Sequence, residues 1–276
     1  MAKSGNHGPA ELPVALVTGA ARGMGAAVAS RLGRDGYAIA ALDVNSSGST
    51  VTTVSAAGSP AAEYRCDLRD WDRVQQVVDE VEEQQGPIAV LASIAGVWEG
   101  IPFLELDPEA WRRVVEVNLT GTFYIARAVA QRMVSRRSGS IVCVASNAAF
   151  MAWEGGAHYS ASKAGLVGLI KGMALELGPH GIRVNCVCPG TVRTPANADE
   201  LDLPGIEAAQ AAACPIGRIG APGDIAEAVA FLADDVKAAW ITGASLLVDG
   251  GFGTHGEGAE FGRHSISVVD LPDTVA

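Results

Sequence analysis

The chain has 276 residues, of which 49% are hydrophobic and 18% are charged, so it carries enough apolar sequence for one sizeable α/β core. Its formal net charge is −11, from 20 Lys and Arg against 31 Asp and Glu, and we therefore expect no nucleic-acid and no membrane partner. No apolar run reaches the roughly 18 residues of a membrane span. The N-terminal segment lacks the apolar stretch of a signal peptide. These features predict a soluble, cytoplasmic protein.

In chain order, short continuous apolar runs alternate with longer helical patterns. The apolar runs predict strands at 13–19, 37–43, 62–67, 88–93, 140–146, 182–190 and 244–251. The helical patterns lie at 23–34, 70–85, 108–136, 157–178 and 223–233. Continuous apolar runs are typical of parallel strands that are covered on both faces. The order therefore predicts an α/β fold with a single Rossmann-type, doubly wound parallel sheet of about seven strands, flanked by helices on both faces.

The same patterns indicate how the domains are organised. No linker or internal repeat interrupts residues 12–251, which we expect to form one domain, after a flexible N-terminal tail at 1–11. The C-terminal tail, 252–276, contains an apolar piece, and two alternatives stay open for it: disorder, or docking on a neighbouring subunit. The irregular stretch 195–215 has weak helical patterns and is predicted to be a mobile lid. The five cysteines form no CxxC pair and no Cys/His cluster with zinc spacing, so no metal site is predicted.

A glycine-rich turn follows the first predicted strand. Gly19, Gly23 and Gly25 occur in "TGAARGMG", between that strand and a helical pattern. Such a turn aims backbone N–H groups and the helix dipole at an anion, and its glycines let a pyrophosphate approach the main chain. The context predicts a dinucleotide site rather than an ordinary tight turn.

The second predicted strand ends in Asp43, about 20 residues after the glycines. A carboxylate there accepts hydrogen bonds from ribose hydroxyls and repels a 2′-phosphate, which favours NAD over NADP. Arg22 argues the other way, because a guanidinium in the glycine turn can pair with that phosphate. We give Asp43 the greater weight and expect NAD.

Tyr159 and Lys163 lie four residues apart in "HYSASKAGL", at the start of a predicted helix. Positions i and i+4 share one helix face, so the two side chains share one electrostatic environment. A cation favours the ionised form of a neighbouring phenol. The alternative is an amphipathic helix with a half-buried tyrosine and a snorkelling lysine.

From 12 to 251 the chain resembles the short-chain dehydrogenase/reductases. The glycine turn, "CDL", "SIAG", "VNLTGTF", "VASNAA", "YSASK" and "PGTVRT" match that family's motifs in the family's order. The resemblance implies an NAD(P)-binding catalytic domain that transfers a hydride between a secondary alcohol or ketone and the nicotinamide. It implies the catalytic residues Asn118, Ser146, Tyr159 and Lys163. It also implies cofactor contacts at Gly19, Arg22, Gly23, Met24, Gly25, Asp43, Asp67, Leu68, Ser93, Ala95, Gly96, Tyr159, Lys163, Pro189, Gly190, Val192 and Thr194.

The chemistry of these residue types agrees with the implied roles. Moving a hydride to or from a carbinol carbon requires a proton to move at its oxygen, and Tyr159 is the expected acid/base. Its ordinary pKa is about 10, and we expect Lys163 and the oxidised nicotinamide to lower it. The hydroxyl of Ser146, at a strand end, is expected to bond the substrate oxygen. Asn118 is a buried amide that needs partners, and the resemblance implies that it holds a relay water.

The chain departs from the family at one motif. The family's two asparagines are Ser93 and Ile94 here, so an asparagine that would stabilise the central strand is missing. We keep the predicted fold and cofactor, and the contacts at Ser93 are the ones this departure affects.

Aromatic and apolar side chains follow the strand ends where the substrate is expected. Trp98, Met151 and Trp153, together with Ser146 and Tyr159, are the expected substrate-binding residues, and they favour an apolar or cyclic secondary alcohol. His158 adjoins Tyr159, but neighbouring helix residues point about 100° apart, and we do not expect it to act in the chemistry. Small residues after Tyr159 suit either a dimer or tetramer interface or close packing on the protein's own sheet. A homo-oligomer is expected.

Two other functional classes stay open at this level. A dinucleotide-binding regulator without catalysis would share the fold, but it would have no need of the Tyr–Lys pair. A methyltransferase-like Rossmann protein would bind a nucleoside without a pyrophosphate, and Asp43 with the glycine turn argues against it.

Overall fold

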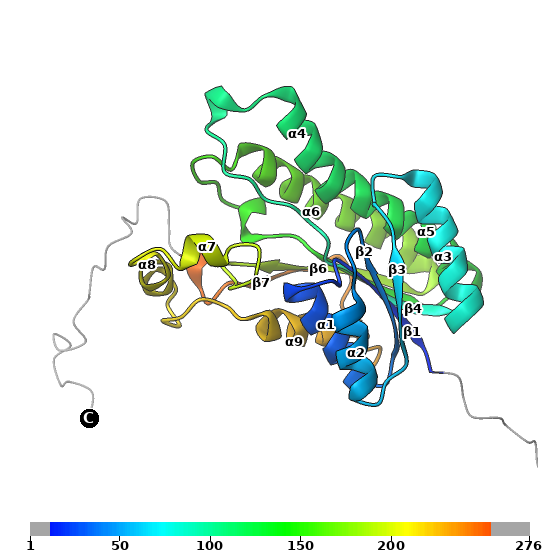
Figure 1. The fold of residues 1–276 in the computed structure, drawn as a ribbon. Coiled ribbons are helices and arrows are strands. Elements are labelled where there is room, and N and C mark those ends of the chain that lie inside the picture. Colours follow the sequence, from blue (N-terminus) through cyan, green and yellow to red (C-terminus); the bar gives the residue numbers. More distant parts are fainter. Residues whose placement is uncertain (1–11, 255–276) are drawn as a thin grey trace, which may run out of the picture.

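Seven parallel strands form one sheet in the computed structural model, which describes residues 12–254 (Figure 1). The strands are β1 Val14–Thr18, β2 Ala38–Asp43, β3 Ala61–Arg65, β4 Ile88–Ser93, β5 Gly139–Val144, β6 Ile182–Pro189 and β7 Ser245–Val248. Their order is β3-β2-β1-β4-β5-β6-β7, and every neighbouring pair is parallel. The predicted doubly wound sheet is confirmed, and each predicted strand lies within a few residues of an observed one.

Two layers of helices cover the sheet (Figure 1). One face carries α3 Trp71–Gln85, α5 Thr122–Arg136 and α6 Ala157–Leu177, and the other carries α1 Gly23–Arg34, α2 Gly48–Ala56 and α9 Pro222–Ala233. Each layer closes its own buried apolar cluster against the central strands, which have no exposed side. The shorter helices are α4 Pro108–Val115, α7 Ala198–Leu201, α8 Ile206–Ala213 and the 3₁₀ turns η1 Phe103–Glu105, η3 Asn147–Ala149, η4 Gly178–His180 and η5 Phe252–Thr254.

The helix predicted over 108–136 is not continuous. It divides into α4, a π-helix η2 at Glu116–Gly121, and α5. The hydroxyl of Thr122 donates to the carbonyl oxygen of Asn118 at 2.9 Å. That carbonyl would accept the amide four residues on in an α-helix, so the threonine side chain competes with the regular ladder where the helix widens.

Helix α2 was not predicted from the sequence. Its segment, "GSTVTTVSA", buries only Thr50 and Val54, so no apolar stripe marks it. The predicted lid 195–215 contains α7 and α8. The predicted tail 1–11 lies outside the described residues, as does 255–276, the part of the C-terminal tail that holds its apolar piece.

Because all strands are parallel, their carboxyl ends lie at one edge of the sheet. The strand order reverses between β1 and β4, and at such a switch point α/β sheets bind their ligands. None of the described helices combines the length and apolarity needed to cross a membrane.

Candidate active site

The turn between β1 and α1 is shaped by three glycines. Gly19 and Gly23 have φ of +68° and +58°, a conformation that favours glycine. A Cβ on Gly25 would lie 2.0 Å from the carbonyl oxygen of Gly19, and one on Gly19 would lie 2.9 Å from the Ala95 backbone. The main chain is therefore bare at the start of α1, and the cradle fits a diphosphate group.

Thr18 holds the backbone of the segment after β4. Its Oγ1 accepts hydrogen bonds from the backbone N–H of Ile94 at 3.0 Å and of Ala95 at 3.1 Å. The threonine thus holds the segment in which Ser93 and Ile94 stand in place of the family's two asparagines. Ser93 is buried, and its hydroxyl has no partner among the described residues.

Asp43, the last residue of β2, contacts the glycine turn. Its carboxylate accepts the N–H of Ala21 at 3.0 Å and the N–H of Asn45 at 2.8 Å. A carboxylate offers about four acceptor positions, so it retains capacity for ribose hydroxyls.

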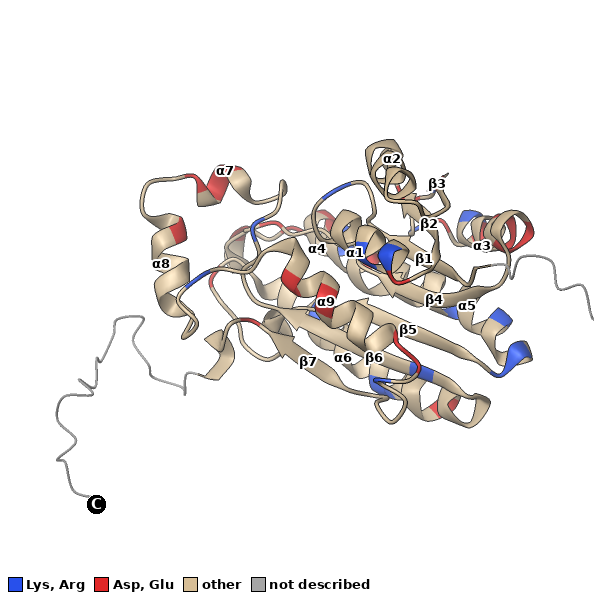
Figure 2. Ribbon diagram, turned by 90° about the horizontal axis from the view of Figure 1, so that it is seen from below, with Lys and Arg blue, Asp and Glu red and all other residues tan. Residues whose placement is uncertain are grey.

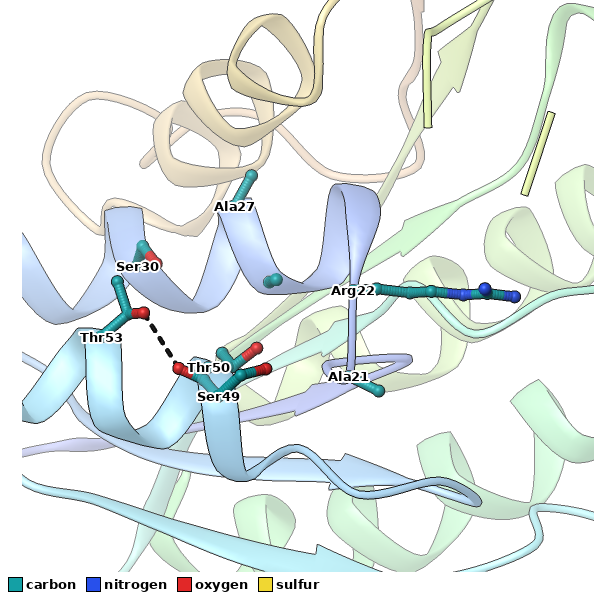
Figure 3. A pocket seen from close by; sticks show the side chains of 8 residues that line it. Ala21, Arg22, Ala27, Ser30, Ser49, Thr50 and Thr53 are labelled. Carbon is teal, nitrogen blue, oxygen red and sulfur yellow. Dashed lines mark hydrogen bonds between the residues drawn. The ribbon is translucent and has the colours of Figure 1, made fainter. Parts of the chain in front are cut away.

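A hollow of about 380 Å³ lies beside this turn, between α1 and α2. Figure 3 shows the Arg22 side chain pointing away from Ser30, Ser49 and Thr53, which also line the hollow. Asp67, one of the predicted cofactor contacts, pairs with Arg69, with Oδ2 and Nη2 2.6 Å apart, and Leu68 is buried.

The segment after β6 completes this edge of the sheet. Pro189 is the buried last residue of β6, and a Cβ on Gly190 would lie 2.8 Å from Cβ of Asp249. A Cβ on Gly23 would lie 3.4 Å from Thr194, so the glycine turn and this segment are in contact. The remaining predicted cofactor residues, Met24 and Val192, pack against the apolar cluster under α1 and α9.

The structure brings Tyr159, Lys163 and Asn118 together. Lys163 Nζ lies 5.6 Å from the centre of the Tyr159 ring and donates to the carbonyl oxygen of Val144 at 3.0 Å. A Cβ placed on Gly96 would lie 3.4 Å from Lys163 Nζ and 3.2 Å from Asn118 Oδ1. Asn118 is fully buried in the π-helix, and its amide bonds the N–H and the carbonyl of Val97.

Ser146 follows the end of β5, facing the tyrosine. Its Oγ accepts the N–H of Ala148 at 3.1 Å. Burial raises the pKa of Tyr159, and the hydrogen bond with Ser146 lowers it in part. In the protein alone burial outweighs the Ser146 bond, and the lowering that we expect from Lys163 together with the oxidised nicotinamide stays a prediction.

Lys163 is itself buried, with 3% of its surface exposed. Burial lowers the pKa of its ammonium to about 8. The lysine is thus mostly protonated at pH 7 and loses its charge as the pH rises through about 8.

Trp98 and Trp153 form an aromatic wall beside Tyr159. The Trp98 ring lies edge-on to the Tyr159 ring at 5.0 Å and to the Trp153 ring at 6.2 Å between centroids. Met151 lies beside the C-terminal turn η5, because a Cβ on Gly253 would lie 3.3 Å from its Cε. Of the predicted substrate residues, the structure thus brings together Trp98, Trp153 and Tyr159.

His158 precedes Tyr159 on α6. It is fully buried, and both its ring nitrogens lack hydrogen-bond partners among the described residues. Burial lowers the pKa of its imidazole, and the ion pair of Glu99 with Arg113 is close enough to act on it electrostatically.

The predicted lid is held by ion pairs. Arg193 bonds Asp202 at 2.9 Å and also pairs with Glu207, so it joins the segment after β6 to α7 and α8. Figure 2 shows acidic residues on both of these helices. Sequence reasoning missed Arg193, Thr18 and Ser162, a buried neighbour of Lys163. Of these residues, only Thr18 could have been found from the sequence, because it directly precedes Gly19, the first glycine of the turn.

No group of three or more His, Cys, Asp or Glu residues within 12–254 is arranged to hold a metal ion.

Known proteins match this chain over most of its length. A family model described as enoyl-(acyl carrier protein) reductase matches residues 19–253. The chain is 41% identical to the D-threitol dehydrogenase of Mycolicibacterium smegmatis, over 87% of this chain and 92% of the relative. It is 39% identical to the L-rhamnose 1-dehydrogenase (NAD(P)⁺) of a Sphingomonas species, over 86% and 94%. It is 40% identical to the cis-4-hydroxycyclohexanecarboxylate dehydrogenase of Sinomonas cyclohexanicum, over 87% and 96%.

The sheet, the glycine turn and these matches define a nicotinamide-dependent oxidoreductase that acts on CH–OH groups. The chain belongs to the short-chain dehydrogenase/reductase family.

Proposed function

We propose that this protein interconverts a cyclic secondary alcohol and its ketone, with NAD(H) as cofactor. The observation that carries the proposal is the placement of the Trp98 ring edge-on to Tyr159, with Lys163 one helical turn away. An aromatic wall beside the acid/base favours a flat or cyclic apolar face over a small charged substrate. Two of the matched relatives are named for substrates with a ring, L-rhamnose and cis-4-hydroxycyclohexanecarboxylate.

In this proposal each residue has a defined task. Ser146 Oγ bonds the substrate oxygen and places it beside Tyr159. Tyr159 donates a proton to a ketone oxygen or removes one from an alcohol. Its raised pKa keeps it protonated near neutral pH, so the protein alone holds it ready as an acid. Bound nicotinamide supplies or takes the hydride, and its oxidised form carries a positive charge.

Lys163 and Asn118 support the tyrosine. The Lys163 ammonium favours the phenolate that forms during alcohol oxidation, and it lies where it can hold ribose hydroxyls beside Gly96. Asn118 fixes the segment that follows β4 through Val97.

We assign NAD rather than NADP because of Asp43. Its carboxylate sits beside the glycine turn and bonds the Ala21 amide. A 2′-phosphate there would meet this negative charge. Arg22 is the competing group.

We also propose a homo-oligomer, dimer or tetramer, in the cytoplasm. Ala161, Ala164, Gly168 and Gly172 are exposed along α6, and added Cβ atoms on the two glycines would meet no neighbour. This face therefore leaves room for a second helix and does not pack on the protein's own sheet. All five cysteines are free and buried, which suits a reducing compartment.

The test is a panel of cyclic and acyclic secondary alcohols and their ketones, followed at the NADH absorbance band. Wild-type protein should turn over the cyclic members best, and Tyr159→Phe should lose activity by about 10²–10⁴-fold while still binding NADH. The alternative, a dinucleotide-binding regulator, predicts NADH binding with no turnover of any alcohol. Undiminished turnover by Tyr159→Phe would refute the mechanism.

A further inference from the structure

Ser162 lies between the two residues of the Tyr–Lys pair and touches neither reacting group. It is 1% exposed on α6. Its Oγ donates to the backbone carbonyl of Tyr159 at 2.7 Å and accepts the Asn118 side-chain Nδ2 at 3.2 Å. A helical serine commonly bonds a carbonyl one turn back. Here the same hydroxyl also bonds a buried amide from a different helix.

The Asn118 amide extends these contacts to the segment that carries Trp98 of the aromatic wall. Its Oδ1 accepts the Val97 N–H at 2.8 Å, and its Nδ2 donates to the Val97 carbonyl at 3.0 Å. Trp98 follows Val97, and its ring returns to Tyr159 at 5.0 Å. Hydrogen bonds therefore link Tyr159, Ser162, Asn118 and Val97 in series. We call this connection the Ser162 clamp.

Both hydrogens of the Asn118 side-chain amide are used within the clamp. An amide nitrogen carries two hydrogens, and Asn118 uses one on Val97 and the other on Ser162. Without the Ser162 hydroxyl, one N–H of a fully buried amide has no acceptor. The amide then regains a partner only by moving, and any movement releases the Val97 backbone that it holds.

We propose that Ser162 is a positioning residue that sets the distance between Trp98 of the aromatic wall and the acid/base Tyr159. This inference rests on the proposed function, because it assigns Tyr159 the proton transfer. Ser162 acts through Asn118 and the Tyr159 backbone and has no contact with the substrate.

The test uses two substitutions of equal shape. Ser162→Thr keeps a hydroxyl, which in helices bonds the carbonyl three or four residues back, and Ser162→Val removes it. Any crowding from the added methyl group is common to both variants, so their difference reports the hydroxyl alone. Ser160→Ala is the control on the same helix, since the Ser160 hydroxyl is buried but has no partner among the described residues.

We expect kcat for a cyclic alcohol to fall about tenfold in Ser162→Val relative to Ser162→Thr, which corresponds to about 1.4 kcal/mol. KM for NAD⁺ should stay within about twofold, because the glycine turn is untouched. Ser160→Ala should match wild type in both constants. Equal kcat values for the threonine and valine variants would overturn the proposal.

Hydrogen exchange supplies a readout that needs no activity. The Val97 amide is held by Asn118, so peptides that contain residues 94–100 should exchange about tenfold faster in Ser162→Val than in Ser162→Thr. Ser160→Ala should leave this exchange unchanged. If the wild-type protein turns over no alcohol, the proposed function fails, while the exchange comparison still decides whether Ser162 holds the wall. Identical exchange in the two Ser162 variants refutes the clamp even if both are active.

Discussion

The ammonium of Lys163 donates a hydrogen bond to the carbonyl oxygen of Val144, 3.0 Å away, at the buried end of β5. Burial lowers the pKa of this lysine to about 8, against about 10.4 in an unfolded chain. Between these values the unfolded chain binds more protons than the folded one, so stability rises with pH across that interval. Below pH 8 the folded protein bears the full cost of burying the charge.

Lys163→Met should therefore stabilise the protein at pH 7 while it abolishes turnover. The expected gain is at most about 3 kcal/mol, reduced by about 1 kcal/mol for the Val144 carbonyl that loses its donor. The advantage over wild type should shrink as pH rises from 8 toward 10.4. Urea unfolding of both proteins at pH 7 and pH 10 measures it. A methionine variant less stable than wild type at pH 7 would contradict the assignment.

Thr18→Val should destabilise the protein and weaken cofactor binding. Valine has the shape of threonine, but it leaves the Ile94 and Ala95 amides without their acceptor. Each buried unpaired group costs about 1–3 kcal/mol, so the two amides together predict a loss of about 2–6 kcal/mol. Thr18→Ser keeps the oxygen and should stay within about 1.5 kcal/mol of wild type.

Chemical denaturation and NADH fluorescence titration measure the two effects of this change. NADH binding should weaken with the valine variant because Gly19 packs against the Ala95 backbone. Equal stability of the valine and serine variants would show that Thr18 does not replace the missing asparagine.

The periodic elements of the fold were predictable, and the irregular ones were not. The segment at 23–34 matches α1 because a strand, three glycines and an apolar stripe leave one solution. The π-helix around Asn118 escaped prediction because a local widening of a helix has no periodic signature in the sequence. Helix α2 escaped because tertiary packing, not its own composition, makes it helical.

The candidate site shows the same division. Motif order located Tyr159, Lys163, Ser146 and Asn118, since the ends of parallel strands must meet at one edge. The raised pKa of Tyr159 in the protein alone was not predicted, because the sequence does not show how deeply the phenol is buried. Ser162 was invisible for a similar reason: a helical serine acquires a second partner only through tertiary contact.

Asp43→Asn should shift cofactor preference toward NADP⁺. The asparagine oxygen can still accept the Ala21 amide, but the charge that repels a 2′-phosphate is gone. A unit charge about 5 Å away in a partly screened site is worth on the order of 3 kcal/mol, so the ratio of kcat/KM for NAD⁺ and NADP⁺ should fall at least about tenfold. Asp67→Asn is the matched control, because that carboxylate pairs with Arg69. It should affect both cofactors equally, and a wild-type preference for NADP⁺ would reverse our assignment.

Trp98→Ala should raise KM for cyclic substrates more than KM for small acyclic ones. The Trp98 ring stands edge-on to Tyr159 and is 40% exposed, so an apolar ring can cover its remaining free surface. Loss of an aromatic contact of this kind is worth about 0.5–1.5 kcal/mol, and KM for a cyclic alcohol should rise about 2–12-fold. KM for 2-propanol should hardly change, because so small a substrate gains little from the wall. Trp240→Ala, at a tryptophan that is 99% exposed, is the control and should alter neither value. Steady-state kinetics with both alcohols decides the point: a uniform loss on the two substrates would mean that Trp98 supports the tyrosine rather than selects the substrate.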